Sequence, residues 1–136
     1  MRVMIVEDEP ILAFELDALV EEAGHESAGW AWDAASAIAL ATERRPDLVL
    51  LDLRLKDGLT GPEIARVLSS DLGLRLLFVT GDFSLIPVGL ANVVGVLAKP
   101  IEAPRLREAL AYADGLASGR ADIPFPTGLR PSPRTI

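Results

Sequence analysis

The sequence predicts an α/β fold in which a parallel β-sheet carries helices on both of its faces. Strand-like apolar runs alternate with helical patterns five times along the 136 residues, and consecutive βα units form parallel sheets through right-handed crossovers. The strand-like runs are apolar at successive positions, which is typical of strands covered on both sides. We therefore expect five βα units arranged as a three-layer sandwich.

Local signals place the first strand and the first helix. Residues 3–6 are apolar, and Pro10 then opens a helix, since proline is favoured in the first turn. Gly24 is expected to end this helix. Residues 25–32 form a weaker second strand with poor alternation. The apolar residues of the helix follow the helical period: Ile11, Leu12, Leu16, Leu19 and Val20.

The second helix and the third strand follow directly. Asp33 is a favourable N-cap, and we expect an Ala-rich helix from there to about Arg44. Pro46 disfavours the helical conformation of the residue before it, so the helix should end at this point. Residues 48–51 are a continuous apolar run, as expected for a strand buried on both faces.

The second half of the chain repeats this alternation less regularly. We expect a helix at about residues 61–70 and a strand at residues 75–79. Residues 82–92 should hold the fourth helix, but Pro87 and Gly89 lie inside this segment. Because proline removes a helical donor and glycine raises the entropy cost, this helix is expected to be short or mobile.

The last strand and helix are predicted at residues 93–98 and at about residues 104–116. The composition changes from Gly119 onward, and no helical period follows it. We therefore expect a folded domain of residues 1–118 and an extended or disordered tail of residues 119–136. The tail contains four prolines: Pro124, Pro126, Pro131 and Pro133.

Composition and charge exclude several classes of function. The net charge of −7 argues against a nucleic-acid surface, which needs a local excess of Lys and Arg. With no cysteine there is neither a disulfide framework nor a thiolate metal site, in keeping with a reducing compartment. No apolar run is long enough to span a bilayer, and the start of the chain does not resemble a signal peptide. We expect a cytoplasmic protein that contacts no membrane.

Reactive polar side chains follow four of the predicted strands. They are Glu7 and Asp8 after the first strand, Asp52 after the third, Thr80 after the fourth and Lys99 after the fifth. Ligands bind at the carboxyl ends of parallel strands, and a flavodoxin-like strand order, 2-1-3-4-5, places strands 1 and 3 side by side at the switch point. The carboxylates and Lys99 should therefore gather at one edge of the sheet.

This set of groups suits phosphoryl chemistry with a divalent cation. Three crowded carboxylates repel one another unless their pKa values rise or a cation balances them, and Mg²⁺ prefers such hard oxygen ligands. A carboxylate beside the metal can attack phosphorus and form an acyl phosphate. Lys99 would balance the charge of the transferred group, and the Thr80 hydroxyl could hydrogen-bond to its oxygens.

The order and spacing of Glu7-Asp8, Asp52, Thr80 and Lys99 resemble the receiver domain of two-component response regulators. The resemblance covers about residues 1–118. It implies a phosphoprotein of a phosphorelay in which Asp52 accepts a phosphoryl group from a histidine kinase or a phosphotransfer protein.

The resemblance also implies roles for the other site residues. Asp8 and Asp52, with the backbone carbonyl of Arg54, would ligate Mg²⁺, and Glu7 would hold metal-bound water. Thr80 and Lys99 would read the phosphoryl group, and Lys99-Pro100 would be a cis peptide.

One departure from the family pattern concerns the switch residue. Receivers usually carry Tyr or Phe three residues before the lysine, and here that position is Val96. The run Phe78-Val79-Thr80-Gly81 is similar to a subgroup of stand-alone receivers with a Phe-Ala-Thr-Gly signature and no aromatic switch. Members of that subgroup often work with kinases of the HWE or a related type.

A second departure lies at the rim of the site. By analogy, Arg54 and Asp82 flank the phosphoryl site at positions that tune hydrolysis in this family. Their opposite charges could pair across the mouth and hinder the attacking water. We expect Arg54→Asn to speed dephosphorylation if this pair shields the site.

The sequence thus predicts a phosphorylation switch that signals through contacts with a downstream protein, as a monomer or weak dimer. It is not expected to be an enzyme beyond its own phosphoryl transfer and dephosphorylation. A pseudo-receiver that is never phosphorylated stays open because of Val96. A phosphatase of the haloacid dehalogenase type needs an aspartate two residues after the nucleophile, where this chain has Arg54. A nucleotide-binding flavodoxin-like domain lacks a Gly-rich motif after the first strand.

Overall fold

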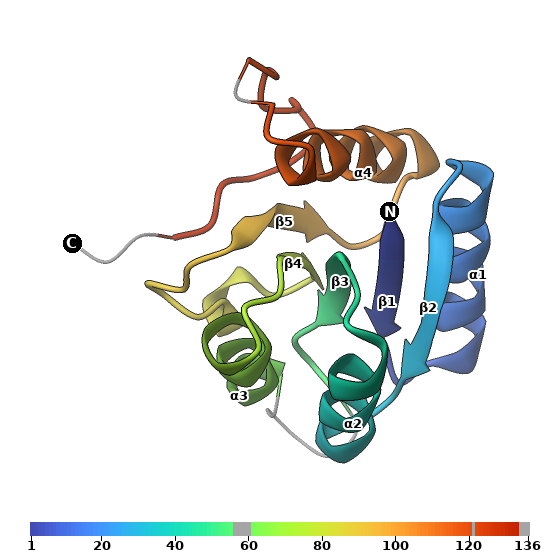
Figure 1. Cartoon of the computed structure of the whole chain (residues 1–136), viewed down its shortest axis with the longest axis vertical. Coiled ribbons are helices and arrows are strands. Elements are labelled where there is room, and N and C mark those ends of the chain that lie inside the picture. Colours follow the sequence, from blue (N-terminus) through green and yellow to red (C-terminus); the bar gives the residue numbers. More distant parts are fainter. Residues whose placement is uncertain (56–60, 121, 134–136) are drawn as a thin grey trace.

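The computed structural model describes residues 1–55, 61–120 and 122–133. Within them, five parallel strands form one sheet in the order β2-β1-β3-β4-β5 (Figure 1). The strands are β1 (Arg2–Val6), β2 (Glu26–Ala31), β3 (Leu48–Asp52), β4 (Leu76–Thr80) and β5 (Val93–Ala98). The predicted α/β class and strand order are confirmed.

Helices cover both faces of this sheet (Figure 1). The α-helices of the described residues are α1 (Pro10–Glu22), α2 (Ala34–Arg44), α3 (Gly61–Arg66) and α4 (Ala103–Ala117). Apolar side chains of α1 and α4 pack in one core cluster, and those of α2 and α3 pack in a second cluster on the opposite face. All residues of β3 and β4 are buried, which explains why their sequences are apolar at successive positions.

Local capping signals set the ends of the second helix as the sequence predicts. The Asp33 side chain accepts a hydrogen bond from the backbone N–H of Ser36, and the Ser36 side chain caps the Asp33 backbone in return. This reciprocal capping satisfies N–H groups that have no partner inside the helix. The helix ends at Arg45, whose φ of 46° lies in the left-handed region, directly before Pro46.

One helix changes type within its predicted range, and another is short, as expected. The helix expected over residues 61–70 is α-helical only to Arg66 and continues as a π-helix, Val67–Asp71. In the fourth crossover, only a 3₁₀ helix, Phe83–Leu85, is present. Pro87 and Gly89, whose φ is 79°, interrupt the helical pattern here, so the fourth βα unit has no α-helix.

The described part of the C-terminal segment, residues 122–133, is extended and runs back over the domain. Leu129 is only 4% exposed, and Arg130 forms an antiparallel bridge with Val96 of β5. The division into a domain of residues 1–118 and a tail of residues 119–136 stays a prediction.

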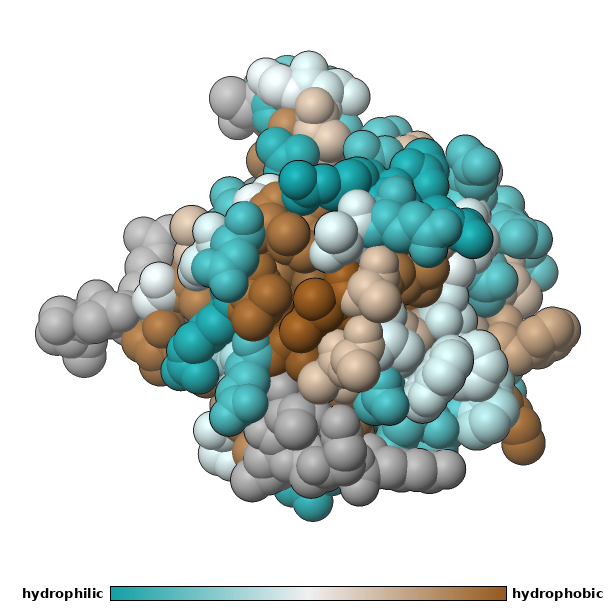
Figure 2. Space-filling view, turned by 60° about the horizontal axis from the view of Figure 1, so that its bottom comes forward, coloured by the Kyte–Doolittle hydropathy of each residue, from teal (hydrophilic) through white to brown (hydrophobic). Residues whose placement is uncertain are grey.

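The surface mixes polar and apolar residues. Seen from below the view of Figure 1, hydrophobic residues gather at the centre of the face with hydrophilic residues around them (Figure 2). Large apolar side chains with high exposure include Ile11 and Phe14 on α1, each 77% exposed. Among the described residues, no helix is long and apolar enough to cross a membrane.

Candidate functional site

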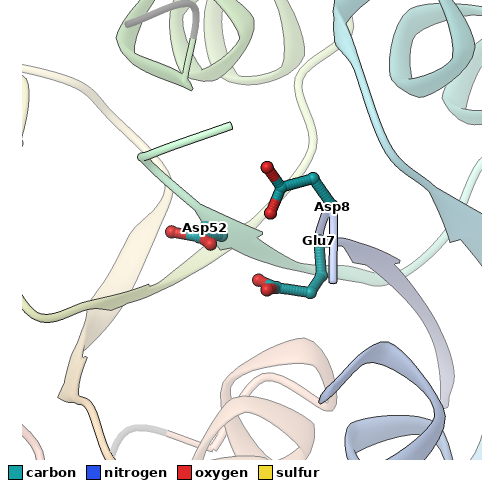
Figure 3. Close-up of side chains that lie close together, drawn as sticks. All are labelled: Glu7, Asp8 and Asp52. Carbon is teal, nitrogen blue, oxygen red and sulfur yellow. The ribbon is translucent and has the colours of Figure 1, made fainter. Parts of the chain in front are cut away.

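Three carboxylates meet where β1 and β3 end side by side. Val6 pairs with Leu51 in the sheet, so Glu7 and Asp8 leave β1 next to Asp52. One carboxylate oxygen from each of the three lies within 4.8 Å of the others, and the side chains turn toward a common space (Figure 3). The structure thus brings together the acidic residues that the sequence placed at this edge.

Asp52 is held in place from two sides. The backbone N–H of Arg54 donates a hydrogen bond to Asp52 Oδ1 over 3.0 Å, and Lys99 Nζ donates one to Oδ2 over 2.9 Å. The Asp52 residue is 5% exposed, and it lines a cavity of about 590 Å³ together with Asp8, Thr80 and Lys99. A small anion entering this cavity would therefore meet an oriented carboxylate.

The environment of Glu7 disfavours the charged form of its carboxyl group. It is 1% exposed, and among the described residues neither of its carboxylate oxygens has a hydrogen-bond partner. Burial, reinforced by the neighbouring Asp52 carboxylate, raises the pKa of Glu7 to about 8, although the Lys99 charge opposes this. At neutral pH, Glu7 is therefore mostly protonated unless a cation stabilises its charged form.

Lys99 supplies the positive charge of the site from the end of β5. Its Nζ atom also lies 3.5 Å from Glu7 Oε2, so one ammonium faces two carboxylates. Burial alone would lower the pKa of Lys99, but the hydrogen bond and charge of Asp52, followed by Glu7, raise it above its ordinary value. The peptide bond between Lys99 and Pro100 is cis.

Thr80 lines the cavity, but its hydroxyl is bound to its own loop. Thr80 Oγ1 donates to the Asp82 carbonyl oxygen over 3.1 Å and accepts from the Asp82 N–H over 3.0 Å. Thr80 is 1% exposed at the end of β4, so its hydroxyl turns toward Asp52 only by giving up these hydrogen bonds or by moving together with the loop after β4.

An ion pair spans the rim of the cavity. Arg54 Nη2 lies 3.1 Å from Asp82 Oδ2, and both side chains are exposed, by 66% and 40%. Hydrogen bonds from Ser84 lower the pKa of Asp82, and the Arg54 charge adds to this effect. The predicted pairing of Arg54 with Asp82 is confirmed, whereas its effect on hydrolysis stays a prediction.

Val96 lies away from the cavity. It is fully buried and packs in the core with Phe78 and Ile86. In an aromatic switch, the ring moves from an exposed position to a buried one on activation. Val96 is aliphatic and already buried at rest, so it cannot make this movement.

Two contributors to the site escaped the sequence reasoning. Trp30 Nε1 donates a hydrogen bond to the Glu7 carbonyl oxygen, and Ser84 holds the Asp82 carboxylate through its backbone N–H. The Trp30 contact depends on the pairing of β1 with β2, so no local sequence signal reports it. The Ser84 contact does have a local signal, because an aspartate often accepts a hydrogen bond from the backbone N–H two residues later.

The acidic cluster fits a hard divalent cation. Glu7 contributes two buried oxygens that have no hydrogen-bond partner among the described residues, and Asp8 and Asp52 each add a carboxylate oxygen within 4.8 Å. Buried charges of this kind are stable only when they are paired, protonated or bound to a metal. The set contains only oxygen donors, which Mg²⁺ or Ca²⁺ prefers to the softer transition metals.

Comparisons with known proteins point to one family. The model of the response regulator receiver domain matches residues 3–111. The chain is 38% identical over 80 residues to the phyllosphere-induced regulator PhyR of Methylorubrum extorquens, covering 58% of this chain and 30% of that protein. It is 36% identical over 87 residues to the DNA-binding response regulator MtrA of Mycolicibacterium smegmatis, covering 64% and 37%.

Solved structures agree with this likeness. The response regulator PhyR from Brucella abortus superposes with a TM-score of 0.76 at 27% identity, covering 87% of this chain and 49% of that one. The signal receiver domain of a modulated diguanylate cyclase from Desulfovibrio desulfuricans superposes with a TM-score of 0.72 at 28% identity, covering 86% and 95%. The chain spans about a third of the length of the curated relatives and nearly all of this isolated receiver domain.

Proposed function

Because this chain belongs to the response regulator receiver family, we propose that it is a phosphorylation switch of a two-component phosphorelay. Asp52 accepts the phosphoryl group from a histidine kinase, such as one of the HWE type, or from a phosphotransfer protein. The phosphorylated chain then changes its contacts with a downstream protein. We place this exchange in the cytoplasm, where ATP-dependent kinases act. The observation that supports the proposal most directly is the oriented Asp52 carboxylate, which lines the cavity beside two acids and a lysine.

The transfer needs little from the chain beyond position and charge. A carboxylate oxygen of Asp52 forms a bond to phosphorus while the bond from phosphorus to the donor histidine nitrogen breaks, and that imidazole leaves with the electron pair. Lys99, 2.9 Å from Asp52, lies where it can offset negative charge on the transferred group. The Arg54 N–H holds the second carboxylate oxygen and so restricts the direction of attack.

Mg²⁺ fits as the cofactor of this reaction, and Glu7, Asp8 and Asp52 would hold it, with the backbone carbonyl of Arg54 as a further ligand. When bound, the ion neutralises charge on the phosphoryl oxygens. Glu7 would release its proton as the cation binds, because its raised pKa reflects burial beside the Asp52 carboxylate, which the Lys99 charge offsets only in part.

The switch itself would run through Thr80 and Lys99. A phosphoryl group on Asp52 offers both side chains a stronger acceptor than they have at rest. For Thr80 this means exchanging its hydrogen bond to the Asp82 carbonyl, 3.1 Å away, for one to a phosphoryl oxygen. The loop that begins at Asp82 would shift with it, and the Arg54–Asp82 pair would control how easily water reaches the acyl phosphate.

A pseudo-receiver that binds partners without phosphorylation is the second candidate. The resting hydrogen bonds of Thr80 to Asp82, and the buried Val96 in place of an aromatic switch residue, favour it. A haloacid dehalogenase-type phosphatase has less support, since the Arg54 side chain is engaged with Asp82 at the rim.

Intact mass after incubation with acetyl phosphate, with and without Mg²⁺, tests the proposal. We expect a Mg²⁺-dependent adduct on the native chain that hydroxylamine removes, as it does acyl phosphates, and that is absent from Asp52→Asn. Asp47→Asn, which changes an exposed aspartate after α2, is the matched control and should keep the adduct. If Asp52→Asn kept the adduct, another residue would be the acceptor. If no adduct formed but Mg²⁺ with beryllofluoride bound, the chain would need a protein as its phosphoryl donor. If neither the adduct nor beryllofluoride binding were seen, the pseudo-receiver would be the supported function.

A further inference from the structure

The C-terminal segment lies along a surface that is shaped for it. From residue 122 to residue 133 it passes over α4 and then along β5 (Figure 1). In the part of the chain that the structure describes, β5 is the last strand of the sheet, so one of its edges has no strand partner. Free edges of this kind accept extended segments through backbone hydrogen bonds.

Backbone pairing attaches the segment to this edge. The Val96 N–H donates to the Arg130 carbonyl oxygen over 2.8 Å, and the Arg130 N–H donates to the Val96 carbonyl oxygen over 2.9 Å. Together they form a single antiparallel bridge. Among the described residues this is the one bridge of the segment, so the pairing is specific in register but limited in extent.

Gly95 makes room for the main anchor of the segment. A Cβ atom at Gly95 would lie 2.6 Å from Cγ of Leu129, closer than real Cβ contacts. Leu129 itself is 4% exposed and joins the core cluster of Leu106 and Leu110 on α4. The leucine therefore fills a site that exists because β5 has a glycine at this position.

Two contacts on α4 repeat this arrangement. A Cβ atom at Gly115 would overlap the Ile123 side chain, so this helical glycine lies directly under the segment. The rings of Tyr112 and Phe125 meet edge to face with centroids 5.3 Å apart. The fit of the segment thus extends from α4 to the edge of β5.

Near its C-terminal end, the segment contacts the loop that follows β4 and borders the Asp52 site. The Arg130 guanidinium lies 4.5 Å from the ring centroid of Phe83, which is a cation–π distance. Phe83 directly follows Asp82, the residue that binds the Thr80 hydroxyl. If Asp82 follows Thr80 toward Asp52, the Phe83 ring that contacts Arg130 moves with it.

We propose that the β5 edge and the adjoining face of α4 form a peptide-docking groove, which residues 123–130 of this chain occupy in the resting state and leave when Asp52 is phosphorylated. The release step rests on the proposed function, whereas the docking does not. By linkage, any change that displaces the segment also favours the phosphorylated state, since the two are mutually exclusive.

Residue-resolved amide hydrogen exchange on the full chain tests the docking. We expect the amides of Val96 and Arg130 to exchange about tenfold or more slowly than in Leu129→Asp and in Gly95→Ala. Gly95→Ala does not alter the sequence of the segment, but it places a methyl group where Leu129 packs. Thr127→Asp, an exposed turn residue, adds the same charge as Leu129→Asp and should keep native protection. Equal exchange in all four proteins, or protection that grows with protein concentration, would overturn intramolecular docking.

The same amides, measured with Mg²⁺ and beryllofluoride, test the release. We expect their protection to fall about tenfold in the native chain and to stay unchanged in Asp52→Asn. Bound beryllofluoride, seen by fluorine NMR, with unchanged protection would overturn the release and leave the proposed function intact. Failure to bind beryllofluoride would count against the proposed function and the release together, while the resting measurement would still decide the docking.

Discussion

Lys99 Nζ donates a hydrogen bond to Asp52 Oδ2 over 2.9 Å, joining the ends of β5 and β3. The two strands are separated by β4 in the sheet, so a side chain as long as lysine is needed to span the gap. The same ammonium lies 3.5 Å from Glu7. Lys99 therefore partly neutralises the cluster at rest, in the space where a divalent cation would bind.

Replacing Lys99 by methionine should strengthen Mg²⁺ binding and weaken the response to phosphorylation. Removing one positive charge a few ångströms from the cluster should lower the Kd for Mg²⁺ about tenfold, which corresponds to ~1.4 kcal/mol at the effective dielectric of a partly buried site. Titration calorimetry measures the affinity. Arg107→Met, on the exposed face of α4, removes the same charge at a distance and should leave the Kd unchanged. An unchanged Kd in Lys99→Met would contradict the electrostatic account.

The raised pKa of Glu7 predicts how stability depends on pH without metal. Its folded-state value of about 8 lies above its ordinary value of 4.5, so between these pH values the folded chain holds a proton that the unfolded chain releases. The contribution of Glu7 to the free energy of unfolding is therefore complete below about pH 4.5 and is lost as the pH rises toward 8. Over this range the free energy of unfolding falls with a slope approaching ~1.4 kcal/mol per pH unit.

Urea unfolding between pH 5 and pH 8 checks this prediction. Glu7→Gln should flatten the decline, because glutamine has no proton to lose, and Glu22→Gln, an exposed residue of α1, should retain it. Saturating Mg²⁺ should stabilise the native chain more at pH 8 than at pH 6. A native chain that gained stability from pH 5 to pH 8 without metal would refute the assignment.

Opening the rim should shorten the life of the acyl phosphate. Arg54→Asn removes the ion pair with Asp82 and clears a path for water, so we expect dephosphorylation to be about two- to fivefold faster, a modest effect because both groups are exposed. Loss of the adduct with time, followed by intact mass, gives the rate. Asp82→Asn should act similarly, and the double variant should add little to either. Equal lifetimes in the native chain and Arg54→Asn would remove the shielding role.

The start of α3 should tolerate no side chain at Gly61. A Cβ atom there would overlap the Leu53 carbonyl oxygen, which is backbone and cannot rotate away. Gly61→Ala should therefore destabilise the fold by about 1–3 kcal/mol. Gly81→Ala is a matched control, because its Cβ would meet its nearest neighbour at 3.9 Å. Urea midpoints of the two variants should differ clearly, and equal midpoints would contradict the steric argument.

Local patterns predict most of the sheet and the acidic residues of the site. Continuous apolar runs predict the buried strands, and the first polar residue after each run lies at the carboxyl end of that strand. The run before Asp52 therefore predicts that Asp52 lies at the carboxyl end of β3. The fourth crossover was harder to predict. Pro87 and Gly89 showed that a helix was disfavoured, but the 3₁₀ helix Phe83–Leu85 depends on the Asp82 cap and on packing after β4.

The order of the apolar runs and the residues that follow them predict a parallel sheet with Glu7, Asp8, Asp52, Thr80 and Lys99 in one site, because parallel strands all end at the same edge. Only the tertiary structure decides where those side chains point. It turns the Thr80 hydroxyl to Asp82, leaves the Glu7 oxygens without hydrogen bonds among the described residues, and seats Leu129 against Gly95. These outcomes depend on contacts between residues far apart in the chain, for which no local pattern carries a signal.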